Sequence, residues 1–346
     1  MLRFNNDYSE VAHESILKKL AQISDEQVCG YGEDQYCKEA ADIIKELMGR
    51  SDADIHFLSG GTQTNLTVIS SILRPHQCAL CAETGHINVH ETGAIEATGH
   101  KVISLKTSDG KLTADMVRNV YKKHWEDSSH EHIAQPKLVY ISNSTEIGTI
   151  YKKDELIALY HACKECGMYL FLDGARLGYA LASEENDLDL KTISENTDVF
   201  YIGGTKCGAM FGEAVVIMND DFKEDFRYII KQKGGMLAKG WLLGIQFSEL
   251  LRDGLYFSLA KKADIQAAKI KQAFIDAGYE LYADSPTNQQ FVIIPDSLLE
   301  ELSKKYVFSY QERIDETKSA VRICTSWATK DENVDSLIDD IKSNGK

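Results

Sequence analysis

Short apolar runs alternate with segments of helical periodicity between about residue 54 and residue 205. The apolar runs have the length of buried strands, and the segments between them repeat apolar side chains as amphipathic helices do. The expected strands are 55–58, 78–82, 101–105, 137–142, 168–172, 199–202 and 213–218. This alternation predicts βαβ units, and therefore an α/β fold with a mostly parallel, seven-stranded sheet and helices on both faces.

The remaining pattern predicts how the chain divides into parts. Expected helices in the first part are 65–73, 86–98, 113–123 and 153–167, and the strand at 213–218 follows its predecessor closely enough to be antiparallel to it. Later segments read as helices at 241–251, 258–277, 298–304 and 331–342 and strands at 290–294, 306–310 and 320–324. We therefore expect an N-terminal segment (1–20) packed on the small domain or a partner, a large domain (21–250) and a smaller α+β domain (251–346).

Composition narrows the class of partner. The formal net charge of −15 argues against nucleic acid or an anionic membrane as the main partner, because both attract basic surfaces. No apolar stretch reaches the ~18 residues of a membrane span, and the N-terminus lacks the apolar core of a signal peptide. A cytoplasmic protein is the expectation.

Eight cysteines include two C-x-x-C pairs, Cys78 with Cys81 and Cys163 with Cys166. The pairs lie too far apart in sequence for a ribbon-type zinc site, and Cys78 and Cys81 point to opposite faces of an expected strand. We expect reduced, structural cysteines and no metal site. Cys207 adjoins Lys206, but nothing assigns it a role.

Lys206 and Asp173 each follow an apolar run that reads as a buried strand. In an open α/β sheet, ligands bind outside the carboxyl ends of the strands, so both side chains are expected at one site. Such a pair suits pyridoxal phosphate (PLP): the lysine forms a Schiff base with its aldehyde, and the aspartate keeps the pyridine nitrogen protonated. The alternative is a surface lysine in a glycine turn and an aspartate that caps a helix.

A glycine-rich turn, Ser59–Asn65, lies between an expected strand and the next helix. Glycines allow close approach of the backbone, and the N–H groups that open the helix, with the hydroxyls of Thr62 or Thr64, suit a phosphate. Gly203–Thr205, directly before Lys206, is a second candidate phosphate loop. Neither motif is specific alone, because glycine-rich strand–helix turns are common.

Three further side chains are candidates for the same site. His86 opens an expected helix, where an imidazole either stacks on a flat ring or acts as a base, or is a solvated helix-end residue. Arg176 follows Asp173 closely, and Arg322 lies in an expected strand of the second domain. Two arginines, one from each domain, suit bidentate binding of a substrate carboxylate. The alternative places Arg322 on an edge strand facing water.

These residues resemble the threonine aldolase (β-eliminating lyase) family of PLP-dependent fold type I enzymes. The order and spacing of the DGARL motif and the lysine are the most specific part of the resemblance, which covers most of the chain. The matching segments are Tyr31–Asp34, Gly60–Asn65, His86–Ile87, Glu91–Ala94, Asp173–Leu177 and Lys206.

The resemblance implies a role for each matching residue. Lys206 carries the cofactor, Asp173 pairs with its ring nitrogen, and His86 stacks over its ring. Arg176 contacts the cofactor O3′ or the substrate carboxylate, and Arg322 binds that carboxylate. The other implied contacts to cofactor or substrate are Gly61, Thr62, Gln63, Thr205, Tyr31, and Asn5 or Asn6 in place of an N-terminal serine. Because fold type I active sites are shared between subunits, the resemblance also implies a homodimer or homotetramer.

Three segments depart from the family pattern. The stretch Ser142–Gly148 has no histidine where the family supplies a second one, and Thr205 stands where serine usually precedes the lysine. The segment Lys233–Leu237 lacks an arginine that reaches the phosphate across the dimer, with Lys233 or Lys239 as substitutes.

We therefore expect a lyase that cleaves a β-hydroxy-α-amino acid, L-threonine or L-allo-threonine, to glycine and an aldehyde. His86 or an ordered water would take the β-hydroxyl proton. The missing histidine leaves open PLP-dependent β-elimination to a 2-oxo acid and ammonia. A third hypothesis, an α/β protein that binds a nucleotide phosphate without PLP, lacks both the P-loop and the dinucleotide-binding patterns.

Overall fold

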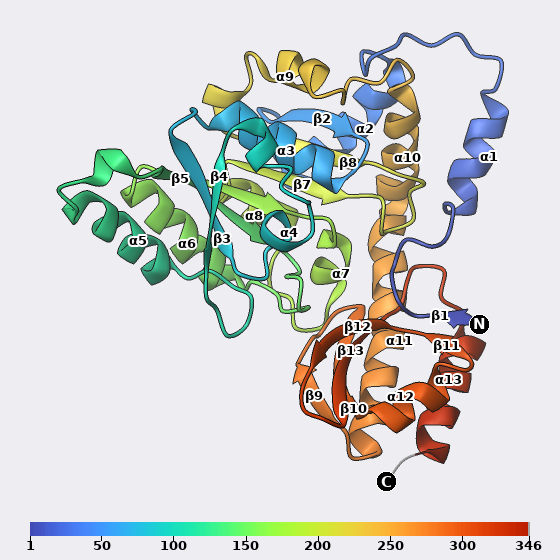
Figure 1. Ribbon diagram of the computed structural model, residues 1–346. Helices are drawn as coiled ribbons and strands as arrows, with labels where there is room; N and C mark the ends of the chain where they lie inside the picture. The colour runs from blue at the N-terminus through green and yellow to red at the C-terminus, as the bar shows by residue number, and fades with distance from the viewer. Residues whose placement is uncertain (345–346) are drawn as a thin grey trace.

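The computed structural model describes residues 1–344, and its largest layer is a seven-stranded sheet (Figure 1). The strands in spatial order are β2 (Asp54–Leu58), β8 (Glu213–Ile217), β7 (Val199–Gly203), β6 (Tyr169–Asp173), β5 (Gln135–Ser142), β3 (Gln77–Ala82) and β4 (Lys101–Leu105). Strand β8 runs antiparallel to β7 and β2, and the other neighbours are parallel. The structure confirms the expected α/β fold with a mostly parallel, seven-stranded sheet.

Helices cover both faces of this sheet, which explains why its strands are continuous apolar runs. In β3, Leu80 and Ala82 belong to the core on one face, whereas Ala79 and Cys81 belong to the core on the other. Successive side chains of a strand alternate between faces, so each face takes every second residue. The helices of this part are α2 (Gln35–Met48), α3 (Gly61–Ile72), α4 (His86–Val89), α5 (Ala114–Glu126), α6 (Lys153–Glu165), α7 (Leu177–Ala182), α8 (Leu190–Glu195), α9 (Phe226–Gln232) and α10 (Trp241–Leu251).

A second, four-stranded antiparallel sheet has its own core. Its strands in order are β12 (Ser309–Arg313), β13 (Lys318–Cys324), β10 (Gln289–Pro295) and β9 (Glu280–Ala283), with helices α12 (Asp296–Leu302) and α13 (Asp331–Ser343). Helix α11 (Leu255–Asp276) packs on α7 of the large part and on β10 and α13 of the small part. Figure 1 shows it continuing the column begun by α10 down to the small sheet.

The N-terminal residues join the small part. Strand β1 (Leu2–Arg3) pairs in parallel with β11 (Tyr306–Val307), and Phe4 is buried in the core of the small sheet. Helix α1 (Glu14–Gln22) packs instead on α10. Residues 4–13, here called the N-terminal strap, therefore connect an element of the small part to an element of the large part.

Two expected elements differ from the structure. The helix expected at 86–98 is reduced to α4 and a single 3-10 turn, Glu96–Thr98. Thr92 and Gly93 between them have φ values of 54° and 72°, and such left-handed residues cannot continue a right-handed helix. The strand expected at 306–310 divides at Phe308 into β11 and β12, which belong to different sheets.

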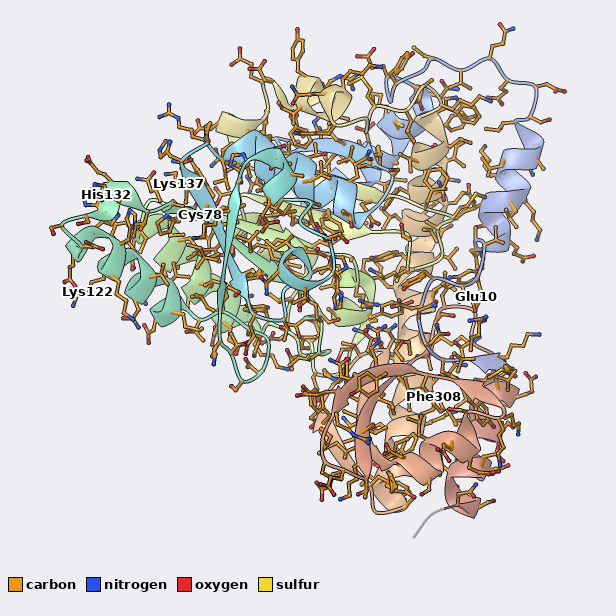
Figure 2. The ribbon with its side chains drawn as sticks, viewed as in Figure 1. Glu10, Cys78, Lys122, His132, Lys137 and Phe308 are labelled. Atoms are coloured by element: carbon orange, nitrogen blue, oxygen red, sulfur yellow. The ribbon has the colours of Figure 1, made fainter. Side chains whose placement is uncertain are left out.

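The carboxyl ends of the parallel strands face the small part. Cys78 and Lys137 lie near the amino ends of β3 and β5, and Figure 2 shows both far from Phe308 of the small part. All eight cysteines are free, and residues 1–344 contain no group of three potential metal-ligating side chains. In the same residues no helix is both long enough and apolar enough to span a membrane.

Candidate active site

A pocket lies where β5, β6 and β7 end, and it contains about 360 Å³ of space between atoms, part of it open to solvent. Its lining residues are Gly61, His86, Ser142, Ser144, Glu146, Asp173, Ala175, Arg176, Tyr201 and Lys206. The structure thus brings together five residues selected from sequence, namely Gly61, His86, Asp173, Arg176 and Lys206. They come from four separate strand ends and helix starts.

Asp173 is buried, and hydrogen-bond donors surround its carboxylate. The phenols of Tyr140 and Tyr201 each donate at 2.5 Å, the amide of Asn65 at 3.0 Å and the N–H of Ala175 at 2.9 Å. Burial alone would raise the pKa of Asp173, but the charge of His86 and these donors lower it below the ordinary 3.8. The carboxylate therefore stays ionised at the end of β6.

The glycine after Asp173 is required by close packing. A Cβ atom at Gly174 would lie 1.7 Å from the carbonyl oxygen of Tyr201, which no side chain could accommodate. This approach of the β6 turn to β7 places the Tyr201 phenol beside Asp173.

Lys206 follows β7, and within residues 1–344 no hydrogen bond or ion pair engages its Nζ atom. Burial and the nearby charge of Arg176 lower the pKa of Lys206, against the opposite effect of Asp7, Glu213 and Asp173. A partly buried amine with a lowered pKa is a nucleophile and a proton acceptor.

His86 is oriented by two carboxylates. Its Nδ1 lies 2.7 Å from Glu91 Oε1, and its backbone N–H donates to Glu146 Oε1 at 2.9 Å. Burial opposes protonation of the ring, but the hydrogen bond to Glu91 and the charge of Asp173 raise the pKa of His86. His86 and Ala175 both line the pocket.

Helix α3 presents an uncapped N-terminus to the pocket. Gly60 precedes it without any side-chain cap, and Gly61 lines the pocket. The first N–H groups of a helix, here those of Gly61, Thr62 and Gln63, have no partner within the helix and attract anions. The side chain of Gln63 folds back to accept from Ser59 Oγ at 2.7 Å.

The second candidate phosphate loop, Gly203–Thr205, has its donors engaged elsewhere. The Thr205 hydroxyl donates to Glu213 Oε1 at 2.8 Å, and the Gly204 and Thr205 N–H groups both donate to the carbonyl of Gly212. An anion beside this loop would have to displace these contacts, whereas the N-terminus of α3 needs no such change.

Arg176 is paired with an aspartate of the N-terminal strap. Its Nε and Nη2 donate to the buried Asp7 at 2.7 and 2.9 Å, and Asn288 of the small part adds a hydrogen bond to Asp7 at 3.0 Å. Burial works against the charge of both groups, but their pairing lowers the pKa of Asp7 and raises that of Arg176. The Nη1 side of the guanidinium remains for a ligand.

Arg322 is less completely paired. Its Nη2 donates to the Asn5 carbonyl at 3.3 Å, and its buried Nε has no hydrogen-bond partner within residues 1–344. The Asn5 side-chain oxygen is likewise buried without a partner, whereas that of Asn6 accepts bonds within its own turn. Figure 2 shows Glu10 of the same strap between the large and small parts.

Tyr31 lies outside this pocket. It has a left-handed φ of 63°, is 47% exposed and lines a separate surface depression with Arg227 and Met236. Within one chain the structure therefore does not join Tyr31 to Lys206 and Asp173.

Sequence reasoning did not select several residues that shape the site. Tyr140 and Tyr201 precede strand ends by two residues, so period-two alternation could have placed them on the face of Asp173. For Glu146, the only feature of the sequence that indicates a place in the site is its position shortly after β5. Asp7 lies 169 residues from Arg176, and no local pattern predicts that contact.

Comparison with known structures defines the class of fold first. A serine palmitoyltransferase from S. paucimobilis with PLP and myriocin bound aligns with a TM-score of 0.71 at 11% identity, covering 99% of this chain and 86% of that one. The large seven-stranded sheet with a small C-terminal sheet is the fold of PLP fold type I enzymes.

Sequence similarity then identifies the family. The profile of the family described as "Beta-eliminating lyase" matches residues 10–297. A low specificity L-threonine aldolase from a Pseudomonas species is 32% identical over 90% of this chain and 89% of its own length. A Leishmania major threonine aldolase structure aligns with a TM-score of 0.97 at 46% identity over 99% of both chains. The chain belongs to the beta-eliminating lyase family.

Proposed function

We propose that this chain is a PLP-dependent aldolase that cleaves β-hydroxy-α-amino acids, L-threonine and L-allo-threonine first among them, to glycine and an aldehyde. One observation carries the proposal: an unpaired lysine amine and a carboxylate with four donors line one pocket. The threonine aldolases among the relatives support it.

The residues present fit PLP at each of its functional groups. Lys206 would hold the aldehyde carbon, the N-terminus of α3 the phosphate, and Asp173 the ring nitrogen. His86 and Ala175 would face the two sides of the ring. When bound, the cofactor supplies an electron sink for the pair released as the Cα–Cβ bond breaks.

Asp173 must exchange one donor to receive the ring nitrogen, because a carboxylate offers about four acceptor positions and all are taken. Asn65 is the donor best able to leave. Its bond to Asp173 is 3.0 Å long, and the same amide donates to Glu91 at 2.7 Å. The two phenols and the Ala175 N–H would continue to hold the carboxylate ionised.

Two arginines would hold the substrate carboxylate. Arg322 has a buried Nε without a partner, and Arg176 keeps its Nη1 side free while Asp7 fixes the rest of the guanidinium. A substrate carboxylate held by both arginines would orient the Cα–Cβ bond toward the electron sink. Holding the reacting bond in this orientation is how these residues would accelerate the reaction.

His86, or a water ordered beside it, would take the β-hydroxyl proton. Since Nδ1 is bound to Glu91, Nε2 is the ring nitrogen left for the substrate. Burial opposes protonation of the ring, but Glu91 and Asp173 raise the pKa of His86, so Nε2 can accept the β-hydroxyl proton only in the neutral ring. Lys206, whose pKa is lowered, would exchange protons at Cα.

Product analysis tests the proposal. The purified, PLP-loaded protein is incubated with L-allo-threonine and with L-threonine, and products are separated and quantified. Glycine and acetaldehyde in equal amounts are the expected result. Finding 2-oxobutyrate and ammonia instead would overturn the aldolase assignment and assign the chain to the β-elimination reaction for which its family is named.

We further propose that the enzyme is cytoplasmic and works as a homodimer or homotetramer. The exposed side chains of Tyr31 and Tyr228, 47% and 76% exposed, flank one surface depression and are suited to a contact with a second copy. The small part is proposed to begin near residue 250, where Asp253 and Gly254 form a left-handed bend before α11. Light scattering of the loaded protein would give the number of subunits.

A further inference from the structure

Glu146 is a carboxylate of the pocket to which the proposed reaction gives no task. It lies shortly after β5, is partly buried, and lines the pocket with His86, Asp173 and Lys206. Its Oε1 accepts from the Ser142 hydroxyl at 2.6 Å and from the His86 N–H at 2.9 Å. No other residue within 1–344 bonds to Oε2, and that oxygen is not enclosed by protein atoms. One oxygen is therefore fixed, and the other remains for a ligand.

The turn that carries Glu146 is held by its own hydrogen bonds and by the small part. The N–H of Thr145 donates to the Thr149 carbonyl at 2.9 Å. From the small part, the Ser285 hydroxyl donates to the Gly148 carbonyl at 3.1 Å. A Cβ atom at Gly148, whose φ is 82°, would lie 2.3 Å from Ser285 Oγ, so glycine is required at this contact. These contacts fix the backbone from which Glu146 reaches the pocket.

The other ionisable side chains of the pocket that could accept a proton already have tasks. Asp173 receives four donors and would face the ring nitrogen, and Lys206 would carry the cofactor. The Nδ1 atom of His86 is bound to Glu91, and this hydrogen bond and the charge of Asp173 raise the pKa of His86 although burial opposes it. A protonated imidazole has no electron pair with which to accept a further proton. Glu146 is the remaining acceptor.

We propose that Glu146 is a catalytic residue whose Oε2 atom binds the β-hydroxyl of the substrate and takes its proton as the Cα–Cβ bond breaks. The inference rests on the proposed function, because it concerns the same cleavage. It replaces the choice between His86 and an ordered water with one named acceptor, and it leaves His86 beside the ring. It also gives the segment Ser142–Gly148, which has no histidine, a proton acceptor of its own.

Protons and electrons balance in this step. The O–H bond of the β-hydroxyl breaks toward Glu146, its electron pair forms the C=O bond of the aldehyde, and the pair of the Cα–Cβ bond passes to the electron sink. Lys206 delivers a proton to Cα, which completes glycine, and regains one from water. Glu146 returns its proton to water, and it also lines a smaller neighbouring space of about 180 Å³ between atoms where water can receive it.

The surroundings of Glu146 suit a base. Burial and the charge of Asp173 raise its pKa above the ordinary 4.5, against the hydrogen bonds from Ser142 and from backbone N–H groups. A base whose pKa lies closer to the working pH takes a proton from a weakly acidic hydroxyl more effectively. The other titratable groups that interact with its charge all have raised pKa values and stay neutral while Glu146 titrates, namely Cys81 on β3, Tyr140 on β5, and Tyr151.

Two reactions of the loaded enzyme distinguish this role from a structural one. Exchange of the glycine α-protons in heavy water, followed by NMR, needs Lys206 and the cofactor but no acceptor for a β-hydroxyl proton. Cleavage of L-allo-threonine needs all three. Glu146→Gln keeps the size of the side chain and an oxygen for the Oε1 contacts, but an amide cannot take the proton. Its kcat for cleavage should therefore fall by about 10²–10⁴-fold, while glycine exchange keeps the wild-type rate.

The matched control is Glu300→Gln, the same change at an exposed position of α12, and it should leave both reactions unchanged. Cleavage by Glu146→Gln at the wild-type rate would overturn the inference. Equal losses of cleavage and of glycine exchange would overturn it too, because Glu146 would then serve the cofactor or the fold instead of the β-hydroxyl.

The pH profile of kcat provides a second test that does not require Glu146→Gln to fold. Because the acceptor must be ionised, kcat of the wild type should fall as pH drops through the pKa of Glu146. Ser142→Ala removes a hydrogen bond that lowers this pKa, so the midpoint of the fall should move to higher pH by roughly 0.5 to 1 unit. Identical midpoints in Ser142→Ala and the wild type would contradict the role of Glu146.

Glycine exchange also separates this inference from the proposed function. A wild-type enzyme that exchanges glycine α-protons but forms no glycine from L-allo-threonine would overturn the aldolase assignment. A wild-type enzyme that cleaves L-allo-threonine, together with undiminished cleavage by Glu146→Gln and an unmoved midpoint in Ser142→Ala, would overturn only the role of Glu146.

Discussion

Asp173 and Glu213 lie at the same edge of the large sheet, on the strands that flank β7, and both are almost fully buried at 4% and 2% exposure. Yet the pKa of Asp173 is lowered, whereas that of Glu213 is raised to about 8. Burial opposes ionisation of both, but Asp173 receives the charge of His86 and four hydrogen bonds, whereas Glu213 receives the charge of Lys206 and only two hydrogen bonds. The number of donors, not the depth of burial, decides which carboxylate stays charged.

The largest effect is expected from Asp173→Asn. The variant keeps the shape of the side chain but cannot stabilise a protonated ring nitrogen, so kcat should fall by on the order of 10³-fold. Steady-state kinetics with L-allo-threonine measures the loss. Borohydride trapping on Lys206 should persist, and turnover near the wild-type rate would remove Asp173 from its proposed role.

Asp7 tests whether an ion pair, instead of neutral hydrogen-bond donors, can stabilise a buried ionised carboxylate. Asp7→Ala leaves Arg176 buried without its partner, which should lower the free energy of unfolding by about 3–5 kcal/mol. Chemical denaturation measures this. The matched control is Asp52→Ala, because Asp52 makes the same two-point contact with Arg50 at the surface. That exposed pair should contribute about 1 kcal/mol or less. Equal losses in the two variants would contradict the role given to burial.

The pH dependence of stability tests whether Glu213, unlike Asp173, has a raised pKa. Because its pKa is raised from the ordinary 4.5 to about 8, the folded state binds more protons than the unfolded state between these values. Stability contributed by this group therefore falls as pH rises through that window. Glu213→Gln abolishes this dependence, so its stability relative to the wild type should increase from pH 5 to pH 8 by at least about 1.4 kcal/mol, one pKa unit. If the stabilities of the wild type and Glu213→Gln changed in parallel with pH, the raised pKa of Glu213 would be contradicted.

The smallest effect is expected from Tyr201→Phe, which removes one of the four donors of Asp173. The lowered pKa of Asp173 contributes stability that is present above its ordinary value of 3.8 and is lost as pH falls through the folded value. The variant should lose about 1 kcal/mol of stability at pH 7, and the loss should shrink as pH falls below 3.8. A loss independent of pH would mean that the phenol contributes packing alone.

Much of the architecture could be predicted because it depends on local patterns. Apolar runs predicted all seven strands of the large sheet. The short connection before Glu213 predicted that β8 is antiparallel to β7. Asp173 and Lys206 stood out because each follows such a run. The helix expected at 86–98 was wrong, since the left-handed backbone at Thr92 and Gly93 leaves no trace in side-chain periodicity.

The sequence by itself determined the order of strands and helices, the family, and which side chains stand at strand ends, because these properties follow from neighbours along the chain. Only the tertiary structure decided how those side chains are charged. Asp7 reaches Arg176 across 169 residues, and two tyrosines from neighbouring strands converge on Asp173. Ionisation of a buried group depends on donors and charges a few ångströms away in space, and their distance along the chain carries no information about it.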